Sequence, residues 1–448
     1  MVKSSLEDII KKRPPISVKP GQKLELTIER VGSQGDGIGS WEGSMVVVPQ
    51  TAQGDKISCV VKYSTRERIH ADLLDVLKSG EGRGKAPCQY YGSCGGCNLQ
   101  HMKKETYKRY KLEVLADALE RNGVEKTFKN VSWFSVGAES RRRAFLRYDG
   151  KLSFGFYAHQ SHEVVDIKEC MMLEPEIQRL ISPLKDLSRK MPETLEGWMI
   201  TIVDNGIDLV MVDSNSKKIE NEDHIVDLLT KFCRAEKISR LQWKLGEKLK
   251  HVYTVSKPIT FINGKEVVLP GEYFLQASKK GQEAIVGYVR DYVKNDAKVL
   301  DLFSGLGIYS FALCDKASHI SAYEISKYMI ESMQDNITRN KLSNKISAIC
   351  RDIEKLPIYR EELQKYDTAI INPPRTGALK QVSNIAGSGI KNVIMISCNS
   401  QTFARDAKVL TDGGYKLSAL HAIDQFYYNH HLEQVGYFVK GPVMNKLL

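Results

Sequence analysis

Apolar and polar positions alternate along the N-terminal part of the chain with the period of half-buried β-strands. This alternation over residues 24–28 and 57–61 predicts two strands, and apolar runs over 45–48 and 69–76 predict two more. A glycine-rich turn, residues 32–39, separates the first two strands. Several short strands joined by such turns are typical of a small barrel of the kind that nucleic-acid modules use.

From about residue 297 the pattern changes to a repeat of strand, glycine turn and helix. The buried strands that it predicts lie at 299–303, 319–323, 346–350, 368–371 and 393–397. Continuously apolar strands that alternate with helices are typical of a parallel, doubly wound sheet. The C-terminal part is therefore expected to have an α/β fold.

Between these two patterns the sequence predicts a linker at 78–87 and a helix at about 103–121, followed by mixed α and β structure. The 448 residues thus divide into a barrel over 14–77, a central region over 78–290 and an α/β domain over 291–448. We expect the helix to pack on the α/β domain.

The chain carries 65 Lys and Arg against 54 Asp and Glu, a net charge of +11. A folded protein this basic is suited to a polyanionic partner such as nucleic acid, although scattered lysines that only maintain solubility give the same sum. No apolar run approaches the roughly 20 residues that cross a bilayer, so no membrane partner is expected. The N-terminal stretch also lacks the apolar core of a signal peptide, which predicts a cytoplasmic protein.

Three of the nine cysteines form a dense cluster. Cys88, Cys94 and Cys97 have the spacing C-x5-C-x2-C, with two glycines before the last. In a cytoplasmic protein such a cluster favours a metal site over disulfides. Zinc and iron–sulfur clusters both use this spacing, and Cys170 is the best candidate for a fourth ligand.

The segment DLFSGLGIYS, residues 301–310, closes a strand and opens a helix, as a cofactor-binding turn does. Glu324 follows Gly305 by 19 positions and is suited to bind ribose hydroxyls. This pairing serves either NAD or S-adenosylmethionine, and the absence of a third glycine weakens the dinucleotide interpretation. Asn372, in INPPRTG at the end of a later strand, can hold a planar polar substrate.

Two further residues are candidates for catalysis. Cys398, in SCNSQTFARD, follows a buried strand and precedes a helix predicted near Gln401, a position that favours the thiolate. Glu433, in HHLEQVGYF, precedes the last apolar strand and could serve as a general base. Taken singly, such a cysteine is more often packed and such a glutamate more often solvated.

Together these motifs resemble the RNA 5-methyluridine methyltransferases. The resemblance is strongest to members with an N-terminal TRAM domain and an iron–sulfur cluster, whose typical targets are uridines of 23S ribosomal RNA. It runs from about residue 14 to the end and implies an OB-like TRAM barrel, a mixed α+β central domain that carries the cluster, and a Rossmann-like methyltransferase domain. The ligands that it implies for the [4Fe–4S] cluster are Cys88, Cys94, Cys97 and Cys170.

The resemblance also implies the site residues and the reaction. S-adenosylmethionine is the expected cofactor, and the residues expected to bind it or the substrate beside it are Gln276 in FLQAS, Phe303, Gly305, Ile308, Glu324 and Asn372. Cys398 is the expected nucleophile toward uridine C6, and Glu433 the base that removes the C5 proton. The expected partner is RNA, with ribosomal RNA favoured and a transfer RNA uridine as the alternative, and the expected state is a monomer.

The sequence departs from the family pattern in three places. Asn372 stands where many relatives have Asp, Ser278 ends FLQAS where Asn is usual, and DQFYYNHHLE replaces the usual Phe-Pro form before the base. An amino- or cytosine-directed methyltransferase and a non-catalytic RNA-binding protein remain alternatives. Basic runs are expected to clamp the RNA backbone, namely Lys103-Lys104, Lys108-Arg109 and Arg141–Arg143.

Overall fold

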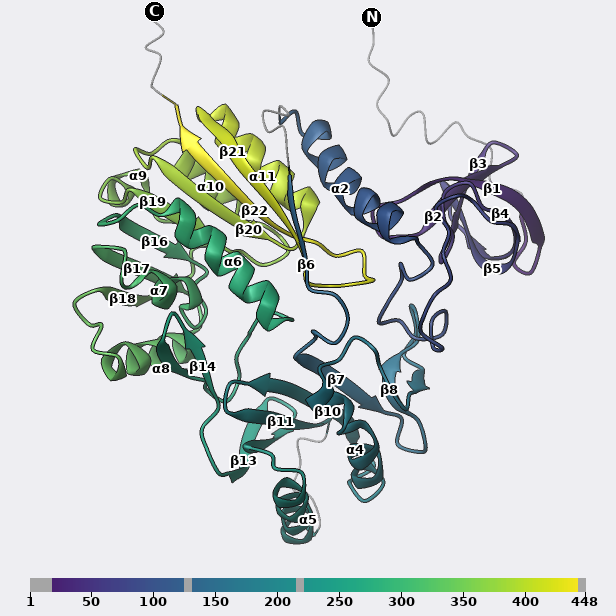
Figure 1. The fold of residues 1–448 in the computed structure, drawn as a ribbon, viewed down its shortest axis with the longest axis horizontal. Helices are drawn as coiled ribbons and strands as arrows, with labels where there is room; N and C mark the ends of the chain where they lie inside the picture. Colours follow the sequence, from purple (N-terminus) through teal and green to yellow (C-terminus); the bar gives the residue numbers. More distant parts are fainter. Residues whose placement is uncertain (1–17, 125–130, 215–220, 442–448) are drawn as a thin grey trace, which may run out of the picture. The chain divides into compact units, whose positions relative to one another are not determined.

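A computed structural model of the chain describes residues 18–124, 131–214 and 221–441 (Figure 1). The described chain forms two compact units. The first holds the residues up to Val114 together with Ala158–Gln160 and Tyr428–His430, and the second holds the remainder. The predicted barrel start at residue 14 and the end of the last domain at 448 lie outside the described residues. The predicted division into three domains stays a prediction.

The first unit contains a closed barrel of five strands in the order β1-β2-β3-β5-β4. The strands are β1 (Lys23–Val31), β2 (Gly37–Trp41), β3 (Ser44–Val48), β4 (Lys56–Ser64) and β5 (Arg68–Lys78). The alternating residues Leu24, Leu26 and Ile28 all point into its core, as the pattern predicts. The sequence prediction was wrong at β2, which was assigned to a turn. A Cβ at Gly39 would lie 2.6 Å from the carbonyl oxygen of Thr27, so the glycine lets two strands approach closely.

The predicted linker is packed against the barrel. Buried Asp55 accepts a hydrogen bond from the backbone N–H of Gly80 at 2.8 Å and pairs with Arg83 at 2.7 Å. Helix α2 (Lys104–Arg121) follows, and its part from Leu115 onward belongs to the second unit. Residues 78–87 are therefore an ordered extension of the barrel.

The second unit begins with a sheet in the order β13-β12-β11-β10-β7-β8-β9. Its strands are β7 (Arg143–Tyr148), β8 (Phe154–Tyr157), β9 (Val164–Asp166), β10 (Leu195–Val203), β11 (Gly206–Asp213), β12 (Arg240–Leu245) and β13 (Lys248–Thr254). Fully buried Trp198 and Trp243 lie in its central strands. The helices of this region are α3 (Pro175–Gln178), α4 (Ile181–Ser188) and α5 (Glu222–Ala235).

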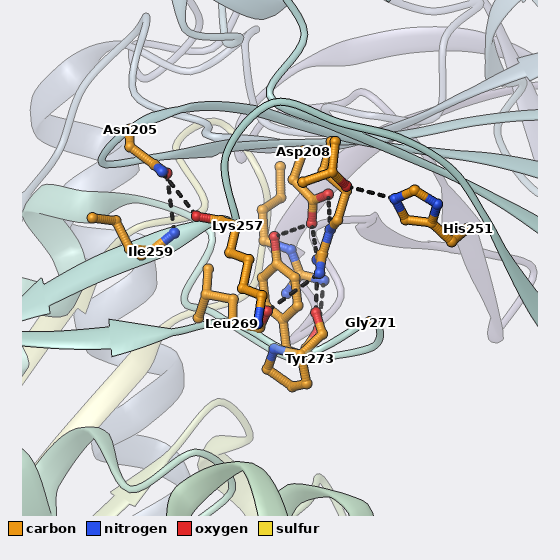
Figure 2. Close-up of polar contacts among 12 residues, drawn as sticks. Asn205, Asp208, His251, Lys257, Ile259, Leu269, Gly271 and Tyr273 are labelled. Atoms are coloured by element: carbon orange, nitrogen blue, oxygen red, sulfur yellow. Dashed lines mark hydrogen bonds and ion pairs between the residues drawn. The ribbon is translucent and has the colours of Figure 1, made fainter. Parts of the chain in front are cut away.

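A buried polar network on this sheet holds the segment that leads to FLQAS (Figure 2). Asp208 accepts two hydrogen bonds from Arg240, at 2.8 and 2.7 Å, and one from the Tyr273 hydroxyl at 2.7 Å. Arg240 also donates to the carbonyl oxygens of Leu269 and Pro270. Because a buried carboxylate is costly unless it is paired, this network holds the segment in one position.

The second unit also contains a sheet in the order β18-β17-β16-β19-β20-β22-β21-β6. Its strands are β16 (Lys298–Leu302), β17 (His319–Glu324), β18 (Ile346–Cys350), β19 (Thr368–Ile371), β20 (Asn392–Ser397), β21 (Tyr415–Asp424), β22 (Glu433–Lys440) and β6 (Ser132–Ser135). The predicted parallel sheet is present from β18 to β20, whereas β22 pairs antiparallel with both neighbours. Edge strand β6 comes from within 78–290.

The strand order reverses direction at β16. From there β17 and β18 extend to one side of the sheet, and β19 and β20 extend to the other. Right-handed crossovers then place helices on both faces, and the carboxyl ends of β16 and β19 flank the crevice where such folds bind ligands. The helices are α6 (Lys279–Tyr292), α7 (Ile308–Leu313), α8 (Lys327–Arg339), α9 (Arg360–Leu363), α10 (Leu379–Ala386) and α11 (Ser400–Asp412), and the hairpin β14 (Ile259–Ile262) and β15 (Lys265–Val268) completes the unit. Within the described ranges, no helix has the length and apolar character needed to span a membrane.

Candidate active site

A cavity of about 980 Å³ opens at the carboxyl ends of the parallel strands. It brings together every residue that the sequence marked for catalysis or for the cofactor, namely Gln276, Phe303, Gly305, Ile308, Glu324, Asn372, Cys398 and Glu433. These residues come from segments up to 157 positions apart (433 − 276). Their roles stay predictions, but their common location gives them one site.

The cofactor turn after β16 has the backbone of a ligand cradle. Phe303 has φ 59°, an uncommon conformation for a non-glycine residue, and Gly305 and Gly307 also have positive φ. The backbone N–H of Gly305 donates to the Glu324 carboxylate at 3.0 Å, and the N–H of Ser326 donates to its other oxygen at 3.0 Å. Glu324 is thus held in one orientation at the edge of the cavity.

Asp301, which the sequence interpretation missed, lies beneath this turn. It is fully buried, and its carboxylate accepts a hydrogen bond from the Ser310 hydroxyl at 2.6 Å. Burial raises the pKa of Asp301 to about 7. An acid within the apolar run VLDL is the sequence signal that could have identified it.

The nucleophile candidate Cys398 lies between β20 and α11. The side chain of Asn399 caps α11 by accepting a hydrogen bond from the N–H of Gln401 at 3.0 Å. The expectation that this position favours the thiolate is opposed by the surroundings of the thiol. Burial, and next the negative charge of Glu433, raise the pKa of Cys398, while Arg375 lowers it.

Arg375 is the positive charge next to both candidate catalytic groups, and the sequence interpretation gave it no catalytic role. Its charge lowers the pKa of Cys398 and that of Glu433. Its guanidinium lies 3.1 Å from Nε2 of His431, and its carbonyl oxygen accepts hydrogen bonds from Asn399 and Thr402 at the start of α11. A cation directly after Asn-Pro-Pro at a strand end was the available signal.

The base candidate Glu433 is the first residue of β22 and is 5% exposed. Burial raises its pKa to about 7 despite a hydrogen bond from Gln425 and the charge of Arg375, which lower it. The Nε2 group of Gln425 donates to Glu433 at 3.0 Å and to the Gln276 side-chain oxygen at 2.6 Å. The sequence interpretation missed Gln425, because a glutamine gives no catalytic signal by itself.

The loop before Glu433 follows an unusual backbone path. Tyr428, which stands in the segment that lacks the family's proline, has φ 61°. Residues Tyr428–His430 group with the first unit, where the Tyr428 carbonyl oxygen accepts hydrogen bonds from the N–H groups of Asn98 and Leu99. Glu433 itself belongs to the second unit, as the first residue of β22.

Two arginines of the run Arg141–Arg143 do not have the predicted role of an RNA clamp. Arg142 is 2% exposed and donates to the carbonyl oxygen of Gln276 at 3.0 Å and to the Gln282 side chain at 2.7 Å. Arg143 donates to the carbonyl oxygen of Leu275 at 2.8 Å. Because these guanidinium groups bind protein carbonyls, they hold the FLQAS segment in place.

The predicted cluster ligands lie in both units. Cys88, Cys94 and Cys97 belong to the first unit and Cys170 to the second. The N–H of Gly96 donates to the Cys94 sulfur at 3.4 Å, a contact that suits a thiolate. Across residues 18–124, 131–214 and 221–441, no group of three or more His, Cys, Asp or Glu side chains is arranged to hold a metal ion. The iron–sulfur cluster stays a prediction.

Comparison with known proteins matches two parts of the chain to known families. The family described as tRNA (uracil-5-)-methyltransferase matches residues 261–440, and the TRAM domain matches residues 17–74. An uncharacterized RNA methyltransferase of Caulobacter vibrioides is 30% identical over 428 residues, which cover 93% of this chain and all of the relative. The 23S rRNA (uracil(1939)-C(5))-methyltransferase RlmD of Halomonas elongata is 27% identical over 465 residues, which cover 97% and 94% of the two chains.

A solved structure has the same fold over almost the whole chain. It is that of the Pyrococcus abyssi tRNA (uracil-54, C5)-methyltransferase in complex with S-adenosyl-L-homocysteine, with a TM-score of 0.72, 20% identity and coverage of 93% of this chain and 99% of that one. With a relative of 30% identity that matches along its length, the chain belongs to a family of RNA methyltransferases, and its residues 261–440 resemble the (uracil-5-)-methyltransferases.

Proposed function

We propose that the protein methylates C5 of a uridine in 23S ribosomal RNA, with S-adenosylmethionine as the methyl donor and a covalent bond between Cys398 and uridine C6. The observation that carries the proposal is that Cys398, Glu433 and the cofactor turn line one cavity. The RNA class is supported by the TRAM domain and by the relative named as a 23S rRNA methyltransferase.

The first step is the attack of the Cys398 thiolate on uridine C6. The new S–C6 bond pushes the electrons of the C5–C6 double bond toward C5 and the neighbouring carbonyl, which makes C5 a nucleophile. The positive charge of Arg375 favours the thiolate against burial and against the charge of Glu433. Asn372, on the same cavity wall, can hydrogen-bond the uracil edge without adding a charge.

The cavity fits S-adenosylmethionine at the cofactor turn. Glu324, oriented by two backbone N–H groups, is suited to bind the ribose hydroxyls, and Phe303, Gly305 and Gln276 line the wall beside it. When bound there, the sulfonium supplies the methyl group to C5, and its sulfur keeps the electron pair of the broken bond.

Glu433 then completes the reaction by removing the C5 proton. The electrons of the C5–H bond restore the C5–C6 double bond, the S–C6 bond breaks, and the thiolate of Cys398 leaves with that electron pair. A carboxylate with a pKa near 7 is a stronger base than an ordinary one, because it holds a proton more tightly. Burial of Glu433 therefore raises its basicity for the removal of the C5 proton.

Mapping of 5-methyluridine tests the proposal directly. RNA from cells that lack the protein should lose 5-methyluridine at a position in 23S ribosomal RNA. The wild type should restore it, whereas Cys398→Ala should restore none, because no other group supplies the attack on C6.

The matched control is Cys350→Ala, which changes an exposed cysteine at the end of β18 and should restore methylation fully. If 5-methyluridine is lost only from transfer RNA, the substrate is transfer RNA and not ribosomal RNA. Unchanged 5-methyluridine in all RNA would contradict the proposed activity. Methylation by Cys398→Ala would contradict the covalent step.

Glu433→Gln should trap the covalent intermediate. Methyl transfer to C5 can still occur, but without a base the C5 proton stays in place and the S–C6 bond is not released. A protein–RNA adduct that survives denaturing electrophoresis should accumulate. Glu331→Gln, on the exposed face of α8, should turn over like the wild type. Equal turnover by both variants contradicts the assignment of the base.

Glu433→Gln should also change how stability depends on pH. The folded-state pKa of Glu433 is raised to about 7 from an ordinary 4.5, so the stability that the neutral carboxyl provides is complete below about pH 4.5 and lost as the pH rises through 7. As the pH rises from about 5 to about 8, the free energy of unfolding of the wild type should fall by roughly 2–4 kcal/mol more than that of the variant. Urea unfolding of both proteins at the two pH values measures this difference. Asp301 is present in both proteins, so its own titration contributes equally to both and cancels. A parallel pH dependence would show that Glu433 is not buried as a carboxyl.

The cysteine cluster is proposed to hold a [4Fe–4S] cluster with a structural or RNA-orienting role, since methyl transfer to an activated carbon needs no electron. Protein purified without oxygen should be brown and contain iron and acid-labile sulfide. Cys94→Ala should be colourless, whereas Cys314→Ala, which changes a buried cysteine of the second unit, should keep the colour. A colourless wild type with stoichiometric zinc would contradict the iron–sulfur assignment.

A further inference from the structure

Gln425 joins two segments of the site that are far apart in the sequence. It lies directly after β21 and is 3% exposed. Its Nε2 group donates to the side-chain oxygen of Gln276 at 2.6 Å and to Oε1 of Glu433 at 3.0 Å. Both partners are themselves buried, at 8% and 5% exposure. A single amide group therefore connects the FLQAS segment to the proposed base.

The chemistry of the contacts fixes the orientation of this amide. An ionised carboxylate only accepts hydrogen bonds, and the amide nitrogen of Gln425 is the group on that side chain that donates them. Its two hydrogens match the two acceptors, while its oxygen has no hydrogen-bond partner among the described residues. This arrangement favours the ionised form of Glu433, because a charged acceptor makes the stronger hydrogen bond.

Gly281, in the first turn of α6, leaves the space that the Gln425 side chain occupies. A Cβ at position 281 would lie 3.0 Å from the Cβ of Gln425 and 3.1 Å from its side-chain oxygen. Gly281 follows FLQAS by only three residues (281 − 278), so one stretch of chain supplies both the Gln276 acceptor and the seat for Gln425. The position of the amide is thus set from two sides.

We propose that Gln425 is a positioning residue that links Gln276 to Glu433 and holds the Glu433 carboxylate ionised and in place to take the C5 proton. This inference rests on the proposed function. Among the groups around Glu433, Gln425 supplies the hydrogen bond that lowers its pKa, and Arg375 supplies a charge in the same direction. Loss of the amide should therefore slow the proton-removal step without slowing the attack of Cys398, because a less charged Glu433 raises the pKa of the thiol less.

The test separates these two steps with two substrates. RNA that contains 5-fluorouridine forms a covalent adduct that stays trapped, because C5 carries fluorine in place of the proton that the base removes. Ordinary uridine RNA reports the complete turnover. Gln425→Met keeps the length of the side chain but removes its donor, so it should form the fluorinated adduct at least as fast as the wild type and turn over uridine RNA more slowly.

The pH profile distinguishes positioning from a structural defect. In Gln425→Met the acidic limb of kcat should move up by about one to two pH units, because the carboxylate loses a hydrogen bond, while KM for RNA should stay unchanged. Gly281→Ala leaves every polar group present and crowds Gln425, so its acidic limb should move in the same direction by a smaller amount.

Gln434→Met is the matched control. Gln434 is fully buried and adjacent to Glu433, but its amide donates to the carbonyl oxygen of Leu432. The same substitution there should leave the acidic limb where it is. Suppose that Gln425→Met and Gly281→Ala both form the adduct and both keep the acidic limb of the wild type. That result contradicts the role of Gln425 and leaves the proposed function standing. Absence of any adduct in the wild type overturns the proposed function, and this inference with it.

Discussion

The site depends on the electrostatic balance among the cation Arg375, the partly buried thiol of Cys398 and the buried carboxyl of Glu433. Cys398 and Glu433 each need a negative charge for the proposed chemistry, yet burial raises the pKa of both, and Glu433 raises that of Cys398 further. Arg375 is the charge that lowers both pKa values. A thiolate and a carboxylate that share one guanidinium need not be ionised at the same moment, since attack on C6 precedes removal of the C5 proton. The order of the steps thus reduces the electrostatic cost of placing both groups in one cavity.

The rest of the second unit serves to hold this cavity. The Asp208–Arg240–Tyr273 network anchors the chain just before FLQAS, and Arg142 and Arg143 bind the carbonyl oxygens of the motif itself. Buried ion pairs and guanidinium–carbonyl contacts add little net stability, because desolvation offsets much of the attraction. What they provide is a single position for Gln276, whose side-chain oxygen accepts a hydrogen bond from Gln425. Polar groups in the central sheet therefore act on the site through geometry.

Much of the architecture could be predicted because it follows from short-range patterns. Alternation over 24–28 and continuous apolar runs such as 299–303 gave barrel and parallel strands that the structure contains. Strand β2 was missed because Gly37 and Gly39 are read as turn residues, whereas their strand conformation depends on close packing against β1 and Thr51. The sequence analysis missed Arg375, Gln425 and Asp301 for a related reason. Their significance lies in what they contact in the folded chain, even where a partner is near in the sequence, as Ser310 is for Asp301 and Glu433 for Gln425.

The same balance of charges gives a physical reason for Asn372. It lines the cavity that also contains Cys398, Glu433 and Glu324. A carboxylate at position 372 would add another negative charge to a buried site in which Arg375 already offsets two acids, and would raise the pKa of the thiol further. An amide offers both a donor and an acceptor to a uracil edge at no cost in charge. Asparagine therefore fits a site whose nucleophile is already disfavoured as a thiolate, and the departure from the family pattern at this position is compatible with the proposed chemistry.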